Sequence, residues 1–230
     1  MQPSFKAWGI FILSSLLITS CSRFPRIVIL EDPLTAEEHN QLGTIYEAQG
    51  KYDLAAKEYE MALKKDPHLN QARVNLGNVL LARKDYAGAE EAYRQALEVE
   101  PENADTLNNL AWVYLERRER LSEAEGLARK ALEIKPSSRM YYLDTLGMAL
   151  LLQGRLVDAE EAFWKALEVM PSDHKALQAE VYYHLALVYK GKGESEKMEE
   201  AVEKIRELDG GRELTRQAES LLSQPLAPSP

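Results

Sequence analysis

Histidines and paired carboxylates are the residues of this chain whose side chains could carry out acid–base or metal chemistry. The four histidines stand at positions 39, 68, 174 and 184. No two of them have the i, i+4 spacing that places two metal ligands on one helix face. The adjacent carboxylates Glu90–Glu91 and Glu160–Glu161 are predicted to lie on a solvated outer face. Neither a glycine-rich phosphate loop nor a nucleophile elbow is present. The sequence therefore predicts a protein that is not an enzyme, with no metal site and no cofactor.

Cys21 is the single cysteine, and it directly follows an apolar stretch. Lys6 is the only charged residue among positions 1–20, and the apolar run from Ala7 to Thr19 spans 13 residues. A membrane-spanning helix needs ~20 apolar residues, so this run is too short. A basic start, an apolar centre and small residues before Cys21 predict a cleaved secretory signal at residues 1–20. A lone cysteine cannot form an intramolecular disulfide, so its thiol is free for another role.

The segment Ile18-Thr19-Ser20-Cys21 resembles the lipobox of bacterial lipoproteins. This resemblance implies cleavage before Cys21 and acylation of that residue, with palmitate among the attached lipids. Two alternatives are a buried thiol in an uncleaved anchor helix and a chance cysteine near an ordinary cleavage site. Ser22 follows the cysteine, and by analogy with enterobacteria this favours the outer membrane, with the protein facing the periplasm.

The chain is acidic, and removal of the signal makes it more so. The full chain has 28 Lys and Arg against 37 Asp and Glu, and the loss of Lys6 leaves 27 against 37, a formal charge of −10. Nucleic-acid binding needs a basic surface, and attraction to anionic lipid needs a basic cluster. We therefore expect neither, and we expect the membrane contact to be the lipid on Cys21.

A repeat of about 34 residues organises the rest of the sequence. A leucine followed by a small residue recurs at spacings of 34, 34, 36 and 39 residues, in Leu42-Gly43, Leu76-Gly77, Leu110-Ala111, Leu146-Gly147 and Leu185-Ala186. An alanine-rich segment follows each of the first four and closes at Pro67, Pro101, Pro136 or Pro171. Apolar residues at helical spacing predict two helices per unit, and each proline is predicted to end the second helix.

Several local signals refine this prediction. Thr35-Ala36-Glu37-Glu38 and Ser122–Glu125 have the pattern of capping boxes that begin helices. The third unit has Ala128 in place of an aromatic residue, and the delay in the fifth unit predicts a longer first helix, at about residues 174–190. Gly210-Gly211 is predicted to end the array, and Leu214, Ala218 and Leu221-Leu222 could cover its open end.

These repeats resemble the tetratricopeptide repeat family from about Thr35 to Leu208. The resemblance implies an all-α, right-handed superhelix of about five helix–turn–helix units with a C-terminal capping helix. The predicted organisation is a signal at 1–20, a lipidated tether at 21–34, repeats at 35–68, 69–102, 103–137, 138–172 and 173–209, a capping helix at 210–224 and a disordered tail at 225–230. Each unit leaves an apolar face that the next one covers.

In this family the concave groove is lined by residues of the first helix of each unit. Carried over position by position, the predicted protein-binding residues are Asn40, Thr44, Asn75, Asn78, Leu81, Asn108, Asn109, Trp112, Tyr141, Asp144, Met148, Tyr183 and His184. The alternative is that they form ordinary helix surface and core. Members that hold a C-terminal carboxylate use lysine and arginine where this chain has Asn40 and Asn108, which argues against carboxylate capture. His39 stands where the family often has tryptophan and is predicted to pack.

The partner predicted by this pattern is an envelope or membrane protein. Only 14 residues separate Cys21 from Thr35, a reach of about 46 Å at ~3.3 Å per residue, so the array would work close to the membrane. The chain resembles pilotin and assembly-adaptor lipoproteins of the bacterial envelope; a self-associating structural element is the other interpretation. The apolar strip Ile27–Leu30 could pack on the first helices or bind a partner.

Overall fold

The computed structural model describes residues 32–208 and 212–223. The chain divides into two units, residues 1–33 and residues 34–230, and all of the helices described belong to the second. The predicted signal, Cys21 and the strip at residues 27–30 lie outside the described residues, as do Gly210, Gly211 and the tail at 225–230. Among the residues described, no helix combines the length and apolar character needed to cross a membrane.

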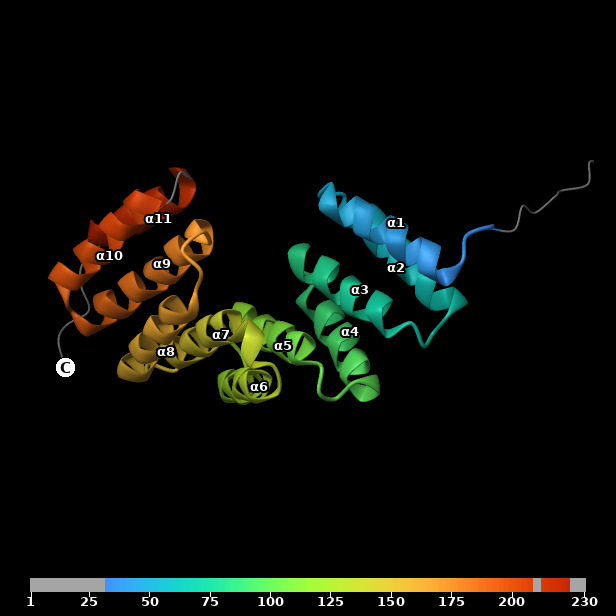
Figure 1. Ribbon diagram of the computed structural model, residues 1–230, viewed down its shortest axis with the longest axis horizontal. Coiled ribbons are helices and arrows are strands. Elements are labelled where there is room, and N and C mark those ends of the chain that lie inside the picture. The colour runs from blue at the N-terminus through green and yellow to red at the C-terminus, as the bar shows by residue number, and fades with distance from the viewer. Residues whose placement is uncertain (1–31, 209–211, 224–230) are drawn as a thin grey trace, which may run out of the picture. The chain divides into compact units, whose positions relative to one another are not determined.

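The described part of the chain is all-α, and its helices form five consecutive antiparallel pairs followed by one more helix (Figure 1). The pairs are α1 (Ala36–Ala48) with α2 (Tyr52–Lys65), α3 (Asn70–Ala82) with α4 (Tyr86–Val99), α5 (Ala104–Arg117) with α6 (Leu121–Ile134), α7 (Arg139–Leu152) with α8 (Leu156–Val169), and α9 (Lys175–Lys192) with α10 (Ser195–Leu208). A 3-10 turn, η1 (Pro136–Ser138), precedes α7, and α11 (Arg212–Leu222) follows the last pair. The predicted fold class is confirmed.

The helix boundaries follow from local sequence. Thr35 forms the predicted capping box, since its hydroxyl accepts from the Glu38 amide at 3.1 Å and its own amide donates to the Glu38 carboxylate at 2.7 Å. At the other ends, α2, α4, α6 and α8 each stop two residues before a proline. The residue before proline is forced towards extended backbone, as at Asp66, whose φ is −132° and ψ 97°.

The second predicted capping box, Ser122–Glu125, is wrong. The helix α6 begins one residue earlier, at Leu121, and Arg120 precedes it in a left-handed conformation with φ 51° and no side-chain cap. Glu125 binds instead the guanidinium groups of Arg129 and Arg155, at 2.8 and 2.9 Å. A carboxylate that satisfies two arginines is not free to turn back to the helix start.

Glycine on the first helix of a pair allows an aromatic ring of the second helix to lie against its backbone. A Cβ added at Gly43 or Gly77 would stand 2.5 Å from Cε1 of Tyr59 or Tyr93, well inside van der Waals contact. Both tyrosine rings are fully buried. The glycines are therefore required by close approach, although glycine within a helix costs about 1 kcal/mol relative to alanine.

The first helices of neighbouring pairs contact one another, in the order α1, α3, α5, α7 and α9. Among the helices described, the backbone of a second helix does not pack against that of the second helix in the next pair. The side of the stack that carries the first helices is thus the shorter, inner side. This arrangement gives the unit an inner surface on which the predicted groove residues can lie.

The last pair and α11 close the array. The helix α9 has 18 residues, against 13 or 14 in the other first helices, which confirms the longer helix predicted for the fifth unit. The final helix packs on both α9 and α10 and buries Ala218 and Leu221. These two side chains cover apolar surface that a sixth pair would otherwise have to cover.

Candidate functional site

The predicted groove residues all lie on α1, α3, α5, α7 and α9, the five helices of the inner side. The structure separates them into three groups by their contacts. One group is an amide network in the first three pairs, the second consists of apolar side chains packed into the core, and the third is a mixed aromatic and charged region on α7 and α9.

The asparagines bind one another across neighbouring helices. The Asn75 amide donates to the Asn40 carbonyl oxygen at 3.0 Å, and the Asn109 amide donates to Asn78 at 2.9 Å. Asn78 also accepts a hydrogen bond of 2.7 Å from the Tyr93 hydroxyl. These bonds join α1 to α3 and α3 to α5, so the amides hold the stack together as well as facing its inner side.

Asn108 differs from its neighbours. Its side-chain oxygen is buried and has no hydrogen-bond partner among the described residues. A buried acceptor without a partner costs free energy. Thr44, by contrast, is exposed, and its hydroxyl donates to the Gln41 carbonyl of the same helix at 2.7 Å.

Three predicted groove residues are apolar and half-buried. Leu81, Trp112 and Met148 all pack against the cluster formed around Tyr93, Leu110 and Tyr114. Their burial supports the core interpretation for much of each side chain, because a packed side chain presents only part of its surface to a ligand. His39 is also a packing residue, 4% exposed, with Nδ1 2.7 Å from the Glu58 carboxylate.

Tyr141 is the large aromatic residue of this set that stays open to solvent, with 45% of its surface exposed. It lines a cavity of about 400 Å³ together with residues at the start of α9, namely Asp173, His174, Lys175, Ala176, Leu177 and Glu180. An exposed aromatic ring beside a cavity is the kind of side chain that anchors a protein partner.

Asp144 of α7 and His184 of α9 form an ion pair. Nδ1 of His184 lies 2.8 Å from Oδ1 of Asp144, and the two side chains are 14% and 12% exposed. Burial opposes a charged imidazole, but the Asp144 carboxylate outweighs it and raises the pKa of His184. The ring also packs on Phe163, at 5.4 Å between centroids, and on Tyr183, at 6.2 Å. His184 therefore links α7, α8 and α9.

The carboxylates expected on a solvated outer face divide into two kinds. Glu91 and Glu161 are exposed, but the side chains of Glu90 and Glu160 are only 15% and 19% exposed. Glu90 binds Arg94, Arg117 and Arg120 at 3.0, 3.0 and 2.6 Å. The expectation was wrong for Glu90 and Glu160 because both lie between neighbouring pairs, where cations of the next pair reach them.

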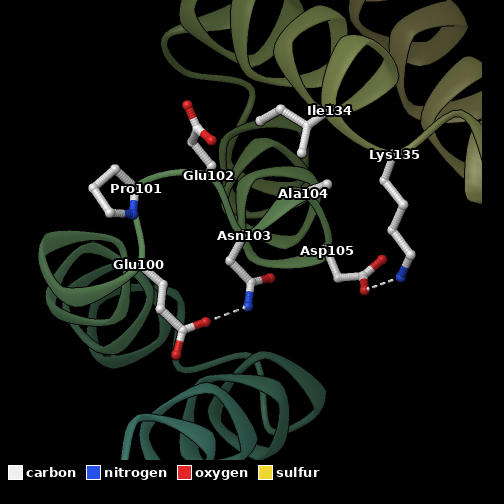
Figure 2. A pocket seen from close by; sticks show the side chains of 8 residues that line it. All are labelled: Glu100, Pro101, Glu102, Asn103, Ala104, Asp105, Ile134 and Lys135. Atoms are coloured by element: carbon white, nitrogen blue, oxygen red, sulfur yellow. Dashed lines mark hydrogen bonds and ion pairs between the residues drawn. The ribbon is translucent and has the colours of Figure 1, made fainter.

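A second cavity, of about 750 Å³, lies where α4 leads into α5 (Figure 2). Three of its four charged residues bind groups within the chain: Glu100 accepts from the Asn103 amide at 3.0 Å, and Asp105 binds Lys135 at 2.7 Å. Burial would raise the pKa of Asp105, but hydrogen bonds from Lys135 and Tyr142 lower it. These bonds therefore stabilise the junction between the second and third pairs. Over the residues described, no group of three or more His, Cys, Asp or Glu could hold a metal ion.

Stacked helical hairpins with an inner binding surface define a class of repeat scaffold. Models of the tetratricopeptide repeat match residues 40–98, 75–139 and 179–210, which together cover more than half of the chain. The protein belongs to the tetratricopeptide repeat family, whose members are protein-binding and typically non-catalytic scaffolds. No curated protein matches the chain.

Solved structures share this fold at low sequence identity. PilW, described as a widely conserved type IV pilus biogenesis factor, superposes with a TM-score of 0.71 and 22% identity over 82% of this chain and 86% of its own. PilF of Pseudomonas aeruginosa gives 0.65 and 22% over 82% and 87%. YrrB, described as having an unusual peptide-binding site, gives 0.58 and 22% over 80% and 92%.

Proposed function

We propose that this protein is a lipid-anchored scaffold of the bacterial envelope that binds a protein or peptide partner along its inner surface during envelope assembly. The anchor is the lipid on Cys21, and the short tether keeps the array near the membrane. The binding residues are the thirteen predicted groove residues, in two different roles. The amide network fixes the geometry of the inner surface, and the exposed side chains contact the partner.

The observation that carries the proposal is the position of Tyr141. Its ring is 45% exposed on an inner helix and borders a cavity whose other wall is α9. Leaving a tyrosine ring in water forgoes the free energy of its burial, and partner binding would recover it. Tyr183 is half-buried on the adjacent inner helix, so a partner segment can meet two aromatic side chains.

Type IV pilus or secretin assembly is the more specific form of the proposal. The likeness to PilF and PilW favours it, because a protein described as a pilus biogenesis factor shares this arrangement of repeats over most of both chains. The likeness is one of fold, and the partner itself has to be identified by experiment.

The test is in vivo crosslinking and affinity recovery of the full chain, with Tyr141→Ala compared with Tyr52→Ala. Tyr52 is the matched control because it is similarly exposed, at 38%, but lies at the start of α2 on a second helix. We expect Tyr141→Ala to reduce recovery of a specific envelope protein at least tenfold and Tyr52→Ala to leave it unchanged. Equal recovery with both variants overturns the groove assignment. Recovery of only further copies of this chain, with oligomers in light scattering, would instead support self-association.

A further inference from the structure

A second cleft lies away from the inner surface, between the second helices of the last two pairs. It has a volume of about 330 Å³ and is lined by Glu160 and Trp164 of α8, Tyr182, Leu185 and Tyr189 of α9, and Lys197, Glu200, Ala201 and Lys204 of α10. The backbones of α8 and α10 both pack against α9 but not against each other. At 100° per residue, Leu185 points about 160° away from the groove residue Tyr183. The cleft is therefore distinct from the proposed groove.

The lining combines aromatic rings with balanced charges. Trp164 is 46% exposed and meets Tyr182 edge to face, with centroids 6.2 Å apart, while its Nε1 donates to the Tyr189 hydroxyl at 3.2 Å. Three of the four charged residues of the lining have partners within the chain: Lys197 binds Glu194 at 2.8 Å, Lys204 binds Glu207 at 2.6 Å, and Glu160 binds Lys192 at 2.6 Å. A ligand for this cleft should therefore be uncharged and able to pack on aromatic rings.

An earlier junction shows how the chain itself can fill such a cleft. Arg94 holds the position on α4 that Trp164 holds on α8, one residue after the buried aromatic ring. Its guanidinium donates to the Tyr114 hydroxyl at 2.7 Å and reaches Glu123 of α6 at 3.5 Å. Arg94 thus bridges α4 and α6. Trp164, in the place of that arginine, bonds to Tyr189 of α9 and not to α10. An ion pair of Glu160 with Lys197, at 4.0 Å, crosses from α8 to α10, and the cleft beside it stays open.

The chain contains a segment with the matching chemistry directly after α11 in the sequence. Residues 224–230 read Gln-Pro-Leu-Ala-Pro-Ser-Pro, with three prolines and no charged side chain. They follow α11, which binds α10 through Glu219 and Arg206 at 3.0 Å. Arg206 and Lys204 are two residues apart on α10, so their side chains point about 160° apart around its axis. The cleft and α11 therefore flank α10 on opposite sides.

We propose that residues 224–230 of this same chain occupy the cleft, with their prolines packed on Trp164 and Tyr182. Seven residues in polyproline II conformation span about 22 Å at ~3.1 Å per residue, and the helix they must pass is about 10–12 Å wide. Aromatic-lined grooves recognise proline-rich segments in this conformation. The docked segment adds a second link between α8 and α10 to the ion pair of Glu160 with Lys197, as Arg94 links α4 to α6.

The test uses the fluorescence of Trp164. The chain has three tryptophans, so Trp8→Phe and Trp112→Phe make Trp164 the only reporter in the full chain. We expect deletion of residues 225–230 to shift its emission to longer wavelength and to raise acrylamide quenching about twofold. A synthetic peptide of residues 223–230 should reverse both changes saturably. Replacing all three tail prolines with alanine, at unchanged length, should have the same effect as the deletion.

Two outcomes overturn the proposal. One is unchanged emission and quenching on deletion, with no saturable response to the peptide. The other is equal binding of the peptide by the intact and the shortened chain, which would show that the cleft is empty in the intact protein. If Trp112→Phe disturbs folding, hydrogen exchange of residues 197–204 in the otherwise unaltered chain serves instead; tail deletion should accelerate it. None of these readouts depends on the groove or on its partner.

Discussion

Gly147 and Phe163 are packed so closely that a Cβ on the glycine would overlap the phenylalanine ring. The same relationship joins Gly43 to Tyr59 and Gly77 to Tyr93. Where the second helix lacks the ring, the first helix has alanine instead: Ala111 is paired with Ala128, and Ala186 with Val202. All four of these smaller side chains are fully buried. Glycine and ring therefore form one packing unit, and the chain alters both members together.

This coupling predicts that the effects of substitutions at Gly147 and Phe163 on stability are not additive. Glycine to alanine within a helix ordinarily stabilises by about 1 kcal/mol, but Gly147→Ala should destabilise by about 1–3 kcal/mol because the added methyl overpacks against Phe163. Phe163→Ala should cost about 3–5 kcal/mol. The double variant copies the third pair and should cost no more than Phe163→Ala alone. Urea denaturation of the four proteins measures the cycle, and additive effects would contradict the coupling.

Lys84 occupies a turn position that belongs to glycine in the first and fourth pairs. It is the middle residue of the three between α3 and α4 and has φ 61°, as Gly50 and Gly154 have φ 69° and 76° in the equivalent turns. A side chain in this left-handed region costs about 1–2 kcal/mol, partly offset by the greater chain entropy of unfolded glycine. Lys84→Gly should thus raise the free energy of unfolding by about 0.5–1 kcal/mol.

The reciprocal change Gly154→Lys provides the control for this prediction. A Cβ at Gly154 would meet nothing within 4 Å, so any loss of stability comes from the backbone and not from a clash. Gly154→Lys should lower the free energy of unfolding by about as much as Lys84→Gly raises it. If Lys84→Gly destabilises the protein, the left-handed turn is not a source of strain there.

The repeat spacing, the glycines and the prolines were enough to predict the helices, because each acts through its own neighbours in sequence. The interactions between pairs were not predictable in the same way. Glu90 was expected in solvent, and Ser122–Glu125 was expected to form a capping box, yet Glu90 and Glu125 each bind an arginine thirty residues further along the chain. The asparagines were identified as residues of the inner face, but their mutual hydrogen bonds follow only from how closely α1, α3 and α5 stack.

The lipid anchor can be tested apart from the repeats. Cys21→Ser removes the thiol to which lipid would be attached, so labelling with a fatty-acid analogue and sedimentation with membranes should both be lost. The array begins at Thr35, so helical content should be unchanged in circular dichroism. Ser22→Ala is a neighbouring control that should keep the label. A Cys21→Ser variant that still sediments with membranes would show that lipid on Cys21 is not the anchor.

The ion pair of His184 with Asp144 should make stability depend on pH. The pKa of His184 is raised by Asp144 in the folded protein, whereas an unfolded histidine titrates near ~6.5. A raised folded pKa means that the stabilisation is fully present below the unfolded pKa and is lost as pH rises through the folded value. The advantage of the wild type over His184→Gln should therefore be largest in mildly acidic solution and shrink in alkaline solution.

The other charged group facing this pair allows the cause to be assigned. Glu180 lies one helical turn before His184 on α9, and both burial and the Asp144 charge raise its pKa. Asp144→Asn should remove the main source of the raised pKa of His184, leaving burial to act in the opposite direction, so stability should then increase with pH in the same window. Glu180→Gln should leave the sign for His184 unchanged. Urea denaturation from about pH 5 to pH 9 distinguishes the three variants, and an identical pH profile for Asp144→Asn and the wild type would contradict the role of the ion pair.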